Sequence, residues 1–297
     1  APKRLHVWKQ SSKDFHVTDT KVSTEDKAVL LQATYLLAAG NLYVVTYKIY
    51  PSGIVHVNAK FTSTDMQAAE TEVSEATRMA TFTPGSDAAR KAASKLEVPR
   101  IGVRFRLPAQ MNNVQYFGRG PEENYIDRNH GTMVGIYQTT ADKMYFNYVR
   151  PQENGHHTDT RWLNLSPDKG NGLVIVADSL IGFNALRNSV EDFDSEEALP
   201  HPYQWNNFSP EEAANHDEKA ARNVLRRMHH VNDVTPRDFV EVCVDMKQQG
   251  VGGYDSWGAR PDPFHQIPAN REYNWGFTLV PVRSGSQATE AAKYDYR

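Results

Sequence analysis

Apolar and polar residues alternate with a period of two along much of the chain, as in half-buried β-strands. The alternation is clearest over residues 101–107, where four apolar side chains would share one face and Arg104 and Arg106 the other. Residues 42–50 and 54–61 are predicted to form a hairpin around a Pro-Ser-Gly turn. Further strands are predicted over residues 173–177, 240–246 and 273–279. Strands spread this widely, without regular βαβ alternation, favour an all-β sandwich.

Three segments interrupt this pattern and are rich in Ala, Glu, Lys or Arg, which predicts short helical insertions. They span residues 65–80, 86–96 and 209–228. In the third, Ser209 and Glu212 have the spacing of a capping box, and Pro210 takes the first helical position. Residues 284–297 lack apolar periodicity and are expected to form a mobile tail. We therefore expect one β domain over residues 1–283.

Composition and charge narrow the classes of partner. The 297 residues carry 33 basic and 36 acidic side chains, a net charge of -3 without a basic block, which argues against nucleic-acid binding. No apolar run reaches the roughly 20 residues that span a bilayer, so we expect no membrane partner. Cys243 is the only cysteine, which excludes an internal disulfide and leaves the compartment open.

A glycine-rich loop at residues 250–258, with the sequence GVGGYDSWG, is the first candidate site. Glycines allow positive φ and close backbone approach, and here four of them surround Trp257. A flat indole beside the polar pair Asp255 and Ser256 suits a sugar ring, whose C–H face packs on the aromatic while its hydroxyls form hydrogen bonds. Tyr254 belongs to the same candidate site. The alternative is that Trp257 caps the edge of the core.

A carboxylate-rich stretch at residues 118–128 is the second candidate. Its carboxylates, among them Glu122 and Glu123, would supply a general acid and a general base, because glycoside hydrolysis needs two positioned carboxyl groups. The alternative is that one of them pairs with Arg119 or Arg128 and holds a structured loop.

A third polar cluster, at residues 148–162, is dense in groups that bind sugar hydroxyls. Its His156, His157 and Asp159 raise the question of a metal site. Adjacent histidines on a strand point to opposite faces, and no second pair of ligands stands out. We therefore expect no metal there.

Taken together, these segments resemble one family. In chain order they read YFGRGPEENYIDR at 116–128, YVRPQENGHHTDTR at 148–161 and GVGGYDSWG at 250–258. They resemble the C-terminal, small-chain-type domain of the large β-galactosidases of glycoside hydrolase family 2, and the likeness runs from about Trp8 to Val282. The resemblance implies a large antiparallel β-supersandwich of the galactose mutarotase type.

The resemblance also implies that the catalytic glutamates and the magnesium ligands lie on a preceding (β/α)8 barrel that this chain lacks. No catalytic residue and no cofactor is then expected here. Trp257 matches a loop tryptophan that reaches the sugar pocket of the barrel, whereas Tyr254 replaces a common acidic or amide residue. A usual lead-in motif is missing, so the chain is expected to begin inside the domain. The remaining motif residues are expected to be structural or to line a cleft, and they are Glu122, Tyr125, Arg128, Glu153, His156 and Arg161.

Three hypotheses follow. The leading one is a non-catalytic domain that contacts a β-galactoside and whose partners are the barrel and other domains of a homo-oligomeric β-galactosidase. The second is an independent mutarotase, with His156 or His157 as the acid and Glu153 as the base. The third is a purely structural or oligomer-interface domain.

Overall fold

The structure is a computed structural model that describes residues 5, 8, 15–37, 40–63, 97–193, 231–255 and 259–296. The strands are β1 His16–Glu25, β2 Ala28–Leu36, β3 Leu42–Ile49, β4 Val55–Thr62, β5 Arg100–Pro108, β6 Asn113–Gly120, β7 Met133–Thr140, β8 His157–Ser166, β9 Gly172–Leu186, β10 Phe239–Gln248 and β11 Tyr273–Val282. The short helices are η1 Val190–Phe193, η3 Val231–Asp233, η4 Pro263–His265, η5 Gly285–Gln287 and α5 Ala288–Ala291.

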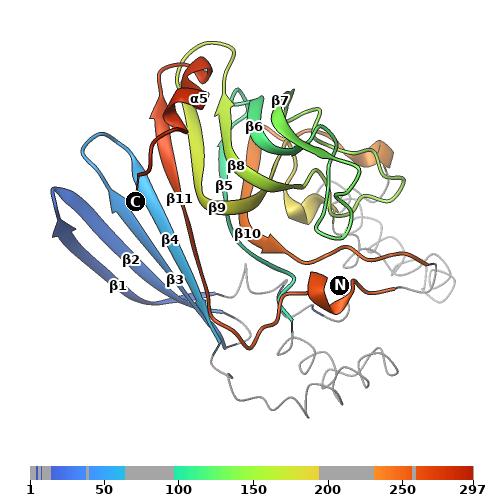
Figure 1. The fold of residues 1–297 in the computed structure, drawn as a ribbon, viewed down its shortest axis with the longest axis horizontal. Helices are drawn as coiled ribbons and strands as arrows, with labels where there is room; N and C mark the ends of the chain where they lie inside the picture. The colour runs from blue at the N-terminus through green and yellow to red at the C-terminus, as the bar shows by residue number, and fades with distance from the viewer. Residues whose placement is uncertain are drawn as a thin grey trace, which may run out of the picture.

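The strands form one antiparallel sheet that bends around β9. Along it the order is β1-β2-β3-β4-β11-β9-β8-β6-β7, and β10 joins β5 to β9. Residues 172–177 of β9 pair with β11, whereas residues 182–186 pair with β10. Because one strand has different neighbours along its length, the sheet folds over itself; Figure 1 shows β1–β4 on one side of the curved β9 and β6–β8 on the other. The predicted all-β sandwich is confirmed.

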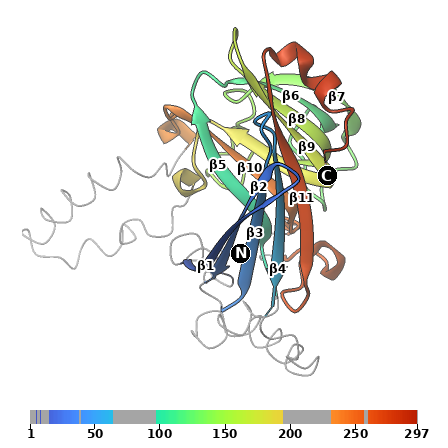
Figure 2. The same cartoon turned by 90° about the vertical axis from the view of Figure 1, so that its left-hand side faces the viewer.

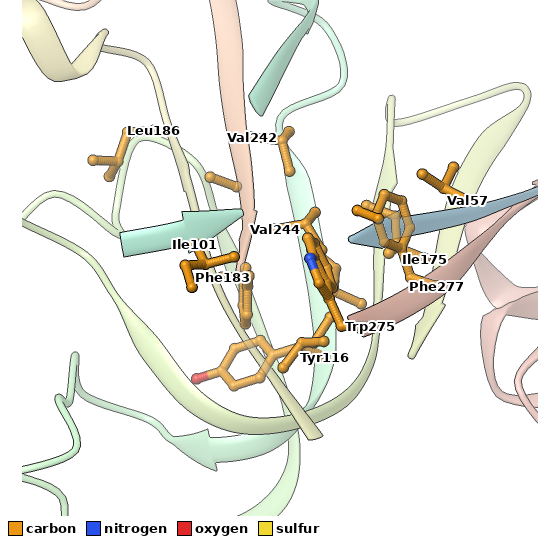
Figure 3. Close-up of a cluster of buried hydrophobic side chains, with 14 of the residues drawn as sticks. Val57, Ile101, Tyr116, Ile175, Phe183, Leu186, Val242, Val244, Trp275 and Phe277 are labelled. Carbon is orange, nitrogen blue, oxygen red and sulfur yellow. The ribbon is translucent and has the colours of Figure 1, made fainter. Parts of the chain in front are cut away.

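The core lies between the two halves of this sheet. Tyr43 of β3 donates a hydrogen bond to the carbonyl of Gly102 on β5 at 3.2 Å and accepts one from Trp275 Nε1 on β11 at 3.2 Å. A polar bridge of this kind holds a tyrosine inside an otherwise apolar core. The apolar side chains of this core come from both halves, and Figure 3 labels Val57, Ile101, Tyr116, Ile175, Phe183, Leu186, Val242, Val244, Trp275 and Phe277.

Every strand predicted from alternation is present. The hairpin is β3 and β4, and residues 101–107, 173–177, 240–246 and 273–279 lie in β5, β9, β10 and β11. Val57, Ala59 and Phe61 are buried on one face of β4, as the pattern predicts. The predicted helices at 65–80, 86–96 and 209–228 lie outside the described residues.

The expected tail contains regular structure. η5 and α5 occupy residues 285–291, and Ala288 is buried with Trp162 of β8 and Val174 of β9. Figure 2 shows α5 at the end of the sheet where β8 and β9 run. The mobility of this segment stays a prediction. Within the described part of the chain, no helix is long and apolar enough to cross a membrane.

Candidate functional site

The three motif segments meet at one corner of the sheet. The first runs from β6 into the turn that follows it, the second leads into β8, and the third follows β10. Glu123 of the first contacts Tyr148 and Gly155 of the second, and Asp127 of the first contacts the backbone of the third at Val251. The motifs that carry the family resemblance therefore form one connected structure.

Glu123 is the centre of this corner, and its side chain is 6% exposed. One carboxylate oxygen accepts hydrogen bonds from Arg128 at 2.7 Å and from the Tyr148 hydroxyl; the other accepts from the Gly155 N–H at 2.8 Å and the Tyr125 hydroxyl at 3.3 Å. Burial raises the pKa of Tyr148, and its hydrogen bond to Glu123 raises it further.

This geometry decides between the two interpretations of the carboxylate-rich stretch. The pairing of Glu123 with Arg128 is confirmed, and the four donors around its two oxygens leave no free lone pair for a substrate. Arg119 pairs instead with Asp159, at 2.5 Å. Glu122 is exposed beside a surface hollow of about 410 Å³, which residues 120–123 and 130–132 line together with Asp127.

The turn after Glu123 places a second carboxylate. Tyr125 and Arg128 exchange two backbone hydrogen bonds, of 2.7 and 3.2 Å, which close a four-residue turn with Asp127 in its third position. One Asp127 oxygen accepts from the Val251 N–H at 3.1 Å, and the other accepts from the Gly252 N–H at 2.8 Å. Sequence reasoning missed this role of Asp127, since the contact joins residues more than 120 positions apart.

The glycine-rich loop is closed at its base. The Gly253 N–H donates to the Ala259 carbonyl at 3.0 Å, and the Ala259 N–H donates to Asp255 Oδ1 at 3.0 Å. Gly252 has a φ of +63°, and a Cβ there would lie 2.5 Å from the Ala259 oxygen, so this position requires glycine. Asp255 therefore helps to close the base of the loop, and Tyr254 is 60% exposed. The sugar contacts expected of these two residues stay predictions.

The central residues of this loop are not described. Ser256, Trp257 and Gly258 lie outside the described residues, so the sugar contacts expected of Ser256 and Trp257 stay predictions.

A buried charge cluster lies behind the corner. Arg100 donates to both oxygens of Asp245, at 2.8 and 2.6 Å, and its guanidinium is 3.5 Å from Glu153. His156 Nδ1 lies 3.8 Å from Asp245 Oδ2, and the imidazole ring stacks on Tyr125. Burial, and then the charge of Arg100, lower the pKa of His156 well below its ordinary value, so the ring is neutral at neutral pH.

This cluster does not form the acid and base of a mutarotase. His156 is buried and neutral, and a Cβ on Gly182 would lie 2.5 Å from its ring, so no sugar reaches it there. Glu153 is engaged with Arg100. His157 is also buried, its two nitrogens lie 3.0 and 3.3 Å from backbone carbonyl oxygens, and burial lowers its pKa.

Arg161 has a structural role. Its guanidinium donates to the Asp159 carbonyl at 2.5 Å and lies 5.3 Å from the centre of the Phe117 ring. Among the residues that the structure describes, no group of three or more His, Cys, Asp or Glu side chains is placed to hold a metal ion.

Comparison with known proteins agrees with these motifs. A family model described as the β-galactosidase small chain matches residues 2–279. A β-galactosidase of Priestia megaterium is 28% identical over 281 residues, which are 94% of this chain and 21% of that protein. A β-galactosidase of Streptococcus thermophilus is 26% identical over 286 residues, which are 95% of this chain and 22% of that protein. The chain thus spans about a fifth of the length of these relatives, and it belongs to the β-galactosidase small-chain family.

Proposed function

We propose that this chain is a non-catalytic, carbohydrate-contacting domain of a β-galactosidase, and that the loop at residues 250–260 completes a sugar site whose reacting groups lie elsewhere in the enzyme. The observation that carries the proposal is that the first motif segment contacts both other segments, the second through Glu123 and the base of this loop through Asp127. The relatives that match nearly the whole chain are named β-galactosidases, and the chain covers about a fifth of their length.

The carboxylates of the described corner support a non-catalytic role. Glu123 accepts four hydrogen bonds, Asp127 holds two backbone amides, and Asp245 is paired with Arg100. Hydrolysis of a β-galactoside with retention of configuration needs a carboxylate nucleophile and a carboxylic acid about 5 Å apart, both open to the substrate. Such a pair would lie on the part of the enzyme that this chain does not cover.

The sugar contact is assigned to Trp257 because of its chemistry. An indole presents a flat apolar face to the C–H groups of a pyranose ring and carries a single N–H donor. The described stem residues hold both ends of the loop, which lowers the conformational entropy lost when a sugar binds. A galactoside bound against this loop would gain affinity without any chemistry from it.

The test is Trp257→Ala in the complete β-galactosidase that contains this chain. We expect kcat/KM for a β-galactoside to fall about 5- to 150-fold, equivalent to the ~1 to 3 kcal/mol of a stacked aromatic. Trp257→Phe keeps an apolar ring and is the matched control, which should retain most of the activity. If Trp257→Ala leaves kcat and KM unchanged, the loop does not contact the substrate and the proposed function is wrong.

A further inference from the structure

We infer that Asp127 is a positioning residue that sets the location of the glycine-rich loop relative to the rest of the domain, and thereby the sugar contact made by that loop. The inference rests on the proposed function, because it concerns the same contact. It assigns to Asp127 a role that the sequence pattern does not indicate, and it predicts an effect on activity that passes through Trp257.

Asp127 contacts the loop through two hydrogen bonds, one on each carboxylate oxygen. The carboxylate offers one oxygen to each of two consecutive peptide N–H groups, those of Val251 and Gly252. A single acceptor leaves a peptide free to pivot, whereas two parallel hydrogen bonds to an anion fix both its position and its orientation. Hydrogen bonds from peptide N–H groups to a carboxylate are also stronger than those to a neutral acceptor.

The absence of a side chain at Gly250 leaves space for the Asp127 carboxylate. A Cβ at that position would lie 2.5 Å from Asp127 Oδ2 and 2.9 Å from Pro261. The Gly250 N–H donates to the His265 carbonyl at 2.8 Å, so the strand end that carries the loop cannot simply move away. Glycine at residue 250 is therefore needed for the carboxylate of residue 127 to lie where it does.

The support beneath Asp127 is rigid. Its turn is closed by the backbone pairing of Tyr125 and Arg128, and the Arg128 guanidinium lies 5.0 Å from the centre of the Tyr125 ring. Glu123 ties that guanidinium to Tyr148 and to the Gly155 backbone. Through Asp127, the loop that follows β10 is thus held at a fixed position relative to β6 and β8.

A second set of contacts, separate from those of Asp127, closes the base of the loop. Asp255 and Gly253 both pair with Ala259, and Arg260 forms an ion pair with Glu97. These contacts close the base of the loop, whereas the contact with Asp127 fixes where that base lies. Removing Asp127 should therefore displace the base of the loop and leave its closure intact.

The experiment is a double-mutant cycle in the complete β-galactosidase, with Asp127→Ala and Trp257→Ala alone and together. We expect Asp127→Ala to lower kcat/KM about tenfold, because a misplacement of about 1 Å costs up to a hundredfold. In the Trp257→Ala background the same change should cost less than about twofold, since the group it positions is gone. Asp127→Asn retains one acceptor and should be intermediate.

Asp168→Ala, which removes an exposed carboxylate that accepts from Asn113, is the control and should leave kcat/KM unchanged. Thermal unfolding of each variant, with activity measured well below the transition, separates displacement of the loop from loss of fold. If Trp257→Ala has its effect while Asp127→Ala has none, or the two effects simply multiply, the positioning role is overturned and the proposed function stands. If Trp257→Ala has no effect, the proposed function itself fails.

Discussion

Replacing Asp245 by alanine is expected to lower the free energy of unfolding of this chain by about 3 to 5 kcal/mol, as for one partner of a buried ion pair. The Asp245 side chain is 2% exposed, and both its oxygens accept from Arg100. Without it, the guanidinium keeps the 3.5 Å contact with Glu153 but loses its two-point partner. Urea denaturation of the two proteins measures the difference.

The matched control removes a carboxylate from an exposed ion pair. Glu290 is 62% exposed and lies 2.6 Å from Lys293, and solvent screens such a pair. Glu290→Ala should therefore leave the urea midpoint nearly unchanged. A similarly small loss for Asp245→Ala would mean that water enters and solvates Arg100, and the buried cluster would then contribute little to stability.

Acid is expected to destabilise the domain between about pH 7 and pH 5 through two buried histidines. Burial lowers the pKa of both His156 and His157 below the ordinary value of 6.5. As the pH falls through about 6.5, each histidine of the unfolded chain takes up a proton that its folded counterpart does not. The free energy of unfolding then decreases with falling pH, by up to about 1.4 kcal/mol per pH unit for each histidine.

Urea denaturation at pH 7.5, 6.5 and 5.5 measures this slope. His156→Gln removes one of the two groups and should reduce the slope by about half, whatever its effect on stability at pH 7.5. His130→Gln, which removes an exposed histidine, is the matched control. An unfolding free energy that is constant from pH 7.5 to 5.5 would contradict the assignment of neutral, buried imidazoles.

Alternation predicted the strands in which one face is apolar and the other polar, and the structure shows why others escaped it. β8 has the sequence HTDTRWLNLS, and most of its polar residues are buried. Thr158 is one example, since its hydroxyl donates to Asn124 Oδ1 at 2.6 Å. Alternation did not predict β1 for the opposite reason: all its residues are exposed at the edge of the sheet, so neither face is buried. Burial that depends on a hydrogen-bond partner leaves no periodic trace in the sequence.

The site was predicted in part. The motifs indicated the three segments that come together, and the pairing of Glu123 with Arg128 was one of the two interpretations of its stretch. The hydrogen bond between Asp127 and the Val251 backbone could not be predicted from the sequence, because it depends on how the turn at residues 125–128 packs against a loop that follows β10. Spacing along the chain reports neighbours on one strand or helix, and it carries no information about contacts between distant loops.

The two halves of the sandwich share β9, which couples their unfolding. β9 pairs with β8 in both its halves, with β11 through residues 172–177 and with β10 through residues 182–186. Neither half can therefore separate from the sheet without exposing amides of the same strand. The domain should unfold as one cooperative unit, in which the amide protons of β9 exchange with solvent water only at the rate of global unfolding.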